Sequence, residues 1–321
     1  MGGLYLGIES RIEVSRMFLQ ARSGGPYPSP NAGLGGLSST IPDIPVCAVF
    51  IFLYVCFAAI NMTIFQLNRR KSHKFVLSAL LFGFSMARIV TLVLRIVWAT
   101  RQHNVQLIIA AQIFVNAGVL IVYIVTLLLA QRVLRAKQPR LGWHPIVRIV
   151  FKILYVLIGV AIIMVIVAVV LSSYTLNHRT QNICRDIQLA GITYLLFFTC
   201  LPLAHVLLGV LLPKSKGEET FGEGSMLSKL IIVGLSSCLC ILIAGFKCGA
   251  TWSPPRPASN PAWYDSKACF YVFNFTLEIL ILGLLTLTRI DKRFFVPNGS
   301  TRAGDYTRLR AQNHDSDKMQ G

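Results

Sequence analysis

Three ionisable side chains stand where the sequence is otherwise apolar. Arg88 and Arg95 lie within one hydrophobic stretch and Glu278 lies within another. In the hydrocarbon layer an arginine costs at least about 2.5 kcal/mol unless a partner neutralises it. The chemistry open to these residues is therefore ion pairing with one another, or binding of a ligand or a lipid headgroup.

Other polar residues accompany them at helical spacing. Arg88 and Arg95 are seven residues apart, which is two helical turns, and two further stripes carry polar residues at spacings of four and seven. Stripes of this kind should face one another inside a helix bundle, away from lipid. The residues expected in this polar core are Arg88, Arg95, Gln112, Asn116, Tyr123, Tyr271, Asn274 and Glu278.

Arg88 and Glu278 are expected at the same depth, near the middle of the membrane. Two interpretations stay open. The pair could neutralise itself and hold the bundle together, as buried ion pairs can. Alternatively, the cluster is a ligand or headgroup site, because Arg95 has no evident acidic partner and an unpaired arginine suits an anionic ligand.

The elements that position these residues are membrane-spanning helices. Of 321 residues 54% are hydrophobic and only 14% charged, and a crossing needs about 20 mostly apolar residues. The sequence predicts an all-α bundle of seven transmembrane helices. They are Pro45–Gln66, Phe75–Ala99, Val105–Ala130, Ile153–Leu171, Leu189–Leu212, Leu230–Phe246 and Phe270–Thr288.

The basic residues between the spans predict the orientation. The odd-numbered loops and the C-terminal tail hold 20 Lys and Arg, and the opposite side holds nine. Basic flanks resist translocation, so the N-terminus is expected outside and the C-terminus in the cytosol. The net charge of +18 then reflects anionic lipid rather than nucleic acid. The nine Lys and Arg expected on the outer side are Arg11, Arg16, Arg22, Arg101, Arg179, Arg185, Lys247, Arg256 and Lys267.

Three regions follow from this topology. Residues 1–44 are expected to form a disordered outer segment, residues 45–297 the membrane domain, and residues 298–321 a disordered cytosolic tail. Four cysteines fall at the outer face, where disulfides are permitted. Cys248 and Cys269 are predicted to close the last outer loop, and the pairing of Cys47 and Cys184 stays open.

The predicted spans lack the residues that several known classes of membrane protein require. The seventh span has no lysine for a retinal Schiff base. His205 is the only histidine within a span, too few for a zinc hydrolase or a di-haem cytochrome. The sequence therefore predicts no cofactor, no metal site and no enzymatic activity.

The second and third spans carry a resemblance. Ser85-Met86-Ala87-Arg88-Ile89-Val90 through Arg95, and Gln112-Ile113-Phe114-Val115-Asn116-Ala117-Gly118 through Tyr123, resemble fungal seven-helix proteins described as family C-like G-protein-coupled receptors. Arg95 and Cys269-Phe270-Tyr271-Val272-Phe273-Asn274 are more distantly similar to the fungal RTA-like lipid-translocating exporters, where an acidic residue is expected in place of Asn274.

These resemblances imply a receptor-like protein of the plasma membrane or an endomembrane. It would bind a small or lipidic ligand in the polar core and signal to a cytosolic protein through its basic loops. The alternative is a transporter or translocator of lipids or amphiphiles. Membrane lipids are expected partners under either reading.

Overall fold

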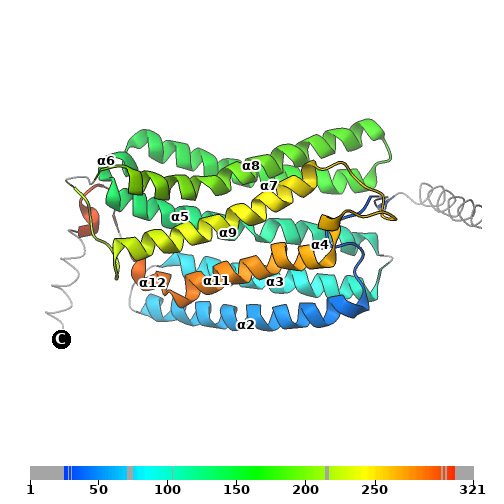
Figure 1. Ribbon diagram of the computed structural model, residues 1–321, viewed down its shortest axis with the longest axis horizontal. Coiled ribbons are helices and arrows are strands. Elements are labelled where there is room, and N and C mark those ends of the chain that lie inside the picture. Colours follow the sequence, from blue (N-terminus) through cyan, green and yellow to red (C-terminus); the bar gives the residue numbers. More distant parts are fainter. Residues whose placement is uncertain are drawn as a thin grey trace, which may run out of the picture.

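The computed structural model describes residues 25–27, 29, 31–70, 75–102, 104–213, 217–297, 299–300 and 302–307. Within these ranges seven helices are long and apolar enough to cross a membrane, and there is no β-strand. The predicted all-α architecture is confirmed. Figure 1 shows the long helices running side by side along one axis.

Two of the seven spans are interrupted helices. The third span is α4 (Val105–Gly118) continued by α5 (Leu120–Lys137), and the seventh is α10 (Lys267–Tyr271), the π-helical turn η2 (Val272–Thr276) and α11 (Leu277–Leu287). The other spans are α2 (Thr40–Arg70), α3 (Val76–Thr100), α7 (Pro145–Tyr174), α8 (His178–Leu211) and α9 (Met226–Trp252). The short helices are α6 (Pro139–Gly142), η1 (Trp263–Asp265) and α12 (Ile290–Arg293).

Most of these helices extend beyond the predicted spans. Side-chain caps set several true starts: Asn177 accepts a hydrogen bond from the Arg179 amide, and Ser225 accepts one from the Ser228 amide. At 1.5 Å per residue the 30 residues of α7 measure about 45 Å, against about 30 Å of hydrocarbon. Hydropathy alone misses these polar end turns, which extend past the apolar layer.

The third span is the centre of the bundle. Its apolar window is 61% buried inside the protein, against 11% for α7. Figure 1 shows α2 on one side and α7 with α8 on the other, with α5 and α9 between them. The fourth span, α7, is thus a peripheral helix whose apolar surface suits contact with lipid.

One end of the bundle is covered by residues 31–39, which we call the capping segment. Its Ala32 amide donates to the Arg256 carbonyl at 2.8 Å, and its Gly35 amide donates to the Asp265 carbonyl at 3.0 Å. Both acceptors belong to the loop that follows α9. We call this end the capped end. The capping segment belongs to the region that the sequence assigned to disorder, and it is held by tertiary hydrogen bonds.

The opposite end, which we call the tail end, holds the described part of the C-terminal tail. The Tyr306 side chain is buried, and its ring lies 5.7 Å from the rings of Trp143 and Phe221. The Glu219 carboxylate accepts hydrogen bonds from the amides of Gly304 at 2.7 Å and Tyr306 at 2.9 Å. Burial raises the pKa of the Tyr306 phenol. Residues 302–307, expected to be disordered, are therefore packed against the bundle.

The two described ends of the chain lie at opposite ends of the bundle (Figure 1). The excess of basic residues at the tail end predicts that this end faces the cytosol. A protease-sensitive tag placed before residue 45 should be cleaved on intact cells, whereas one placed after residue 321 should be cleaved only after permeabilisation. The reverse pattern would contradict the predicted orientation.

Candidate functional site

The ion-pair site lies in the middle of the bundle and consists of Arg88, Glu278, Tyr54 and Lys247. The Arg88 Nε donates to Glu278 Oε2 at 2.5 Å, and Arg88 Nη2 donates to Glu278 Oε1. Both side chains are fully buried. The Tyr54 hydroxyl donates to Glu278 Oε2 at 3.4 Å. The structure thus brings together two residues of the predicted polar core in a bidentate ion pair that joins α3 to α11.

A break in the third span completes the coordination of Arg88. In a continuous helix the Val115 carbonyl would accept from the Val119 amide, but this amide bonds to Ala117 instead. The freed Val115 carbonyl accepts from Arg88 Nη1 at 3.0 Å. Gly118 permits this approach, because a Cβ there would lie 3.0 Å from Arg88 Nη1. All three nitrogens of the guanidinium therefore donate to the protein.

Lys247 is a member of this site that the sequence prediction missed, because it was counted among the loop residues. It lies in α9, which extends to Trp252, and only 6% of the residue is exposed. Its ammonium interacts electrostatically with Arg88 and Glu278. Within the described residues its one hydrogen bond is to the Val115 carbonyl, at 3.5 Å. The site holds two basic side chains and one carboxylate, and one of the basic side chains is weakly coordinated.

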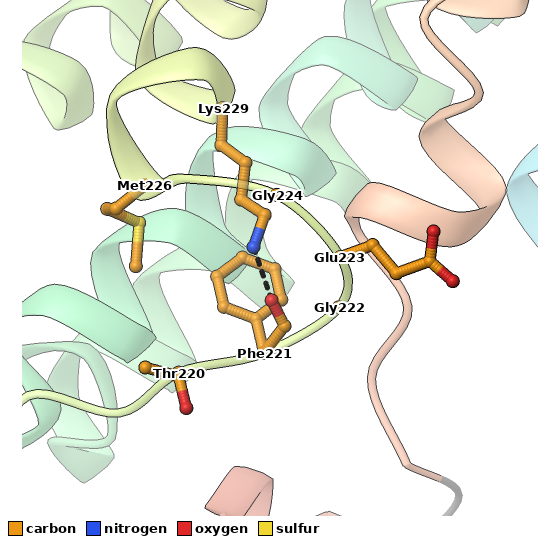
Figure 2. Close-up of a pocket in the computed structure, with 7 residues that line it drawn as sticks. All are labelled: Thr220, Phe221, Gly222, Glu223, Gly224, Met226 and Lys229. Atoms are coloured by element: carbon orange, nitrogen blue, oxygen red, sulfur yellow. Dashed lines mark hydrogen bonds between the residues drawn. The ribbon is translucent and has the colours of Figure 1, made fainter.

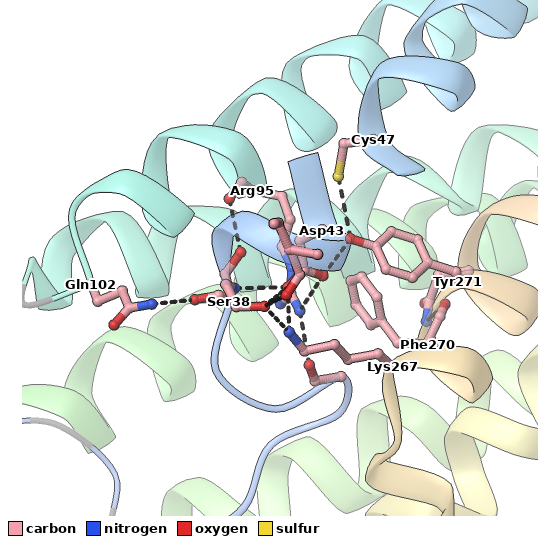
Figure 3. A network of polar contacts seen from close by, with 12 residues as sticks. Ser38, Asp43, Cys47, Arg95, Gln102, Lys267, Phe270 and Tyr271 are labelled. Atoms are coloured by element: carbon pink, nitrogen blue, oxygen red, sulfur yellow. Dashed lines mark hydrogen bonds and ion pairs between the residues drawn. The ribbon is translucent and has the colours of Figure 1, made fainter. Parts of the chain in front are cut away.

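A second polar cluster, the outer network, lies at the capped end. It consists of Asp43, Arg95, Lys267 and Tyr271, which Figure 3 labels, together with Ser39. The Asp43 carboxylate accepts from Tyr271 Oη at 2.5 Å, Lys267 Nζ at 2.6 Å and the Ser39 amide at 2.8 Å. Asp43 is fully buried, and the Lys267 side chain is 30% exposed. One carboxylate thus connects the capping segment to α2 and α10.

The expectation that Arg95 lacks an acidic partner is wrong. Arg95 Nη2 lies 3.4 Å from Asp43 Oδ1 and donates to the Gly35 carbonyl at 2.8 Å. Its guanidinium also lies 4.5 Å from the centre of the Phe270 ring. The sequence analysis did not consider Asp43 as a partner because this residue precedes the apolar stretch of α2. The argument that an unpaired Arg95 calls for an anionic ligand is therefore withdrawn.

Gly35 is the point where the capping segment touches Phe270. Its φ is +81°, and a Cβ there would lie 2.5 Å from Phe270 Cγ. Gly36 also has a positive φ, +54°, but a Cβ there would meet nothing within 4 Å. Gly36→Ala should therefore cost only the backbone penalty of about 1 kcal/mol, and Gly35→Ala distinctly more. Equal melting temperatures for the two variants would show that the segment does not pack as described.

Three of the remaining predicted core residues come from the third span, and only one is buried. Gln112 and Asn116 are exposed on α4, so the expectation that they line the polar core is wrong. Few residues of α4 are buried, whereas α5 is buried on nearly every side, so Tyr123 is buried although it stands at helical spacing from Gln112 and Asn116. Tyr123, beyond the break, is buried with no hydrogen-bond partner for its hydroxyl within the described residues.

Asn274 and Tyr271 lie on either side of the start of the π-helical turn. Asn274 is fully buried and donates to the Phe270 carbonyl at 2.9 Å, while its Oδ1 has no partner among the described residues. Tyr271 belongs to the outer network rather than to the ion-pair site. The predicted single core is therefore two clusters, and both use α3 and the seventh span. Turns of π-helix are frequent at functional sites.

The predicted bridge between Cys248 and Cys269 is not formed. All eight cysteines lie in the described ranges and all are free thiols. Cys248 is buried in α9, and the Cys269 sulfur lies 3.7 Å from the Trp263 carbonyl oxygen. Ending the sixth span at Phe246 placed Cys248 in a loop. It lies instead within a helix that continues to Trp252.

The free thiols can be tested by mass mapping. Alkylation of the denatured, unreduced protein should modify both Cys248 and Cys269, because neither sulfur is consumed in a bridge. Prior reduction should leave the extent of labelling unchanged. A cross-linked peptide that contains both residues would contradict the structure.

A surface depression of about 470 Å³ lies at the tail end, beside the start of α9. Figure 2 shows the Lys229 ammonium reaching the Phe221 carbonyl within it. The same ammonium lies 4.3 Å from the centre of the Phe221 ring. Lys229 therefore holds the loop before α9 in place. None of the residues that line this depression belongs to the ion-pair site or the outer network.

One comparison bears on this geometry. Residues 224–295 match a family profile described as a protein of unknown function, DUF3112. The matched part contains α9, the loop after it and the seventh span, and so includes Lys247, Lys267, Tyr271 and Glu278. No curated protein and no solved structure matches the chain.

Proposed function

We propose that this seven-helix membrane protein is receptor-like and binds a small or lipidic ligand beside the ion-pair site. The observation that carries the proposal is the buried Lys247 ammonium, which has a single hydrogen bond, at 3.5 Å, beside a carboxylate already held by Arg88. A buried cation without full compensation is costly. A carboxylate or phosphate on the ligand would supply the missing partner.

The route for a signal follows the helices that carry both clusters. The outer network joins the capping segment to α3 and α10, and the ion-pair site joins α3 to α11. A ligand that separates Glu278 from Arg88 would let these helices move against each other. A cytosolic protein bound to the basic loops would respond to that movement. The proposal places the protein in the plasma membrane or an endomembrane and assigns it no catalytic step.

A thermal-shift screen tests the binding step. Purified protein is screened against fatty acids, lysophospholipids and small carboxylates, each paired with its neutral ester or alcohol. We expect an acidic compound to raise the melting temperature of the wild type and not that of Lys247→Met. Lys152→Met, which removes an exposed lysine of α7, should respond like the wild type. Equal responses of both variants would remove Lys247 from the site.

The resemblance to the RTA-like exporters keeps lipid movement as the alternative outcome. Reconstituted vesicles that contain a fluorescent phospholipid distinguish the two functions. Ligand-dependent recruitment of a G protein or another cytosolic partner supports a receptor. Movement of the labelled lipid between leaflets without added ligand supports a translocator and would overturn the receptor proposal.

A further inference from the structure

A depression of about 540 Å³ lies at the tail end, where α7 begins. It is lined by Trp143, Pro145, Arg148, Arg302 and Ala303, which include two arginines and no acidic residue. Within the described part of the chain neither guanidinium donates a hydrogen bond or forms an ion pair. Two cations therefore face one hollow without a protein partner.

The hollow adjoins the lipid-facing surface of α7. Ile146, Ile149 and Ile153, in the first turns of this helix, are 63%, 55% and 53% exposed. An apolar surface of this kind on a membrane-spanning helix contacts acyl chains. Arg148 lies in the same turns but roughly 100° or more around the helix from each of these isoleucines, so the hollow borders their apolar face. Trp143 adds an amphipathic ring of the type enriched at the membrane interface.

The backbone at Arg302 is held in position by the fold. The Arg302 amide donates to the Asp305 carboxylate at 2.9 Å, and the next turn is anchored by buried Tyr306. The Tyr306 ring in turn packs edge-on against Trp143. The side of the hollow formed by the tail is thus built from tertiary contacts, not from a loose chain end.

We propose that this hollow, which we call the headgroup site, binds an anionic phospholipid of the adjacent leaflet by its headgroup phosphate. Arginine pairs with phosphate through two parallel hydrogen bonds, which gives both affinity and geometry. The acyl chains would lie along the isoleucines of α7. The first turn of this long helix adds positive potential at the same place. The proposal is independent of the ligand proposed for the ion-pair site.

Native mass spectrometry of the full chain in detergent tests the headgroup site. The probes are phosphatidylinositol 4-phosphate and, as a neutral reference, phosphatidylcholine. The variant Arg148→Gln with Arg302→Gln should weaken binding of the anionic lipid at least about tenfold, because it removes both charged hydrogen-bond donors to the phosphate. Binding of phosphatidylcholine should be unchanged.

The matched control is Arg69→Gln with Arg70→Gln, which removes two exposed arginines from the end of α2. This variant has the same net charge as the Arg148 and Arg302 variant and should bind the anionic lipid like the wild type. Equal weakening in both variants would mean that any basic surface at this end suffices, which overturns the site. A melting temperature of the lipid-free Arg148 and Arg302 variant close to the wild type shows that the fold is kept; if it falls, Arg148→Gln alone must show the weakening.

A soluble competitor distinguishes the source of the phosphate. Glycerophosphoinositol 4-phosphate carries the same headgroup without acyl chains. Since the apolar face of α7 is part of the site, this compound should not displace the lipid at equal concentration. Full displacement by the soluble headgroup would show a free phosphate site and overturn the assignment to a lipid.

Discussion

Replacing Arg88 or Glu278 alone with leucine should destabilise the protein more than replacing both. Each single change leaves a fully buried charge without its partner, and losses of about 3 to 5 kcal/mol are typical for such sites. The membrane reference state reduces these values. The double change removes both charges and should recover part of the loss. Thermal unfolding of the four proteins in one detergent gives the comparison.

The same four proteins form a double-mutant cycle that distinguishes a structural role of the Arg88–Glu278 pair from a ligand-binding role. If the pair is only a clamp between α3 and α11, the double variant should keep the ligand response of the wild type. If it is part of the binding site, stability should return and the response should not. Arg70→Leu, which removes an exposed arginine, is the control and should leave stability nearly unchanged. Strictly additive losses would show that Arg88 and Glu278 do not interact.

Replacing Asp43 with alanine should loosen the capped end. The change removes the acceptor shared by Lys267, Tyr271 and the Ser39 amide, and it leaves Arg95 and Lys267 without their common anion. Loss of one partner of a buried ion pair costs about 3 kcal/mol or more. Hydrogen exchange should rise first in the capping segment, which Asp43 holds to the bundle.

The matched control is Asp186→Ala, since Asp186 is an exposed carboxylate of α8. It should change neither the melting temperature nor the exchange of residues 31–39. Faster exchange of the capping segment in Asp43→Ala and not in Asp186→Ala would support the conclusion that Asp43 holds this segment to the bundle. Unchanged exchange in that variant would mean that the segment is held by its backbone hydrogen bonds alone.

The sequence by itself determined the number of crossings and the class of fold. Seven apolar stretches of sufficient length have no other stable arrangement in lipid, because each backbone polar group must be paired within its own helix. The depth of Arg88 and Glu278 followed from their positions along two such stretches. The nearly continuous apolar sequence of α7 suits its peripheral place.

Only the tertiary structure decided how the polar groups pair. Asp43 lies 52 residues from Arg95 and outside the predicted span, so nothing local links the two. Lys247 became a core residue because α9 continues past the apolar stretch. Gln112 is exposed because α4, unlike α5, is surrounded by few other helices. Hydropathy measures how well each segment tolerates lipid. The partner of a buried charge depends instead on where helices end, where they break and which backbone carbonyls those breaks release.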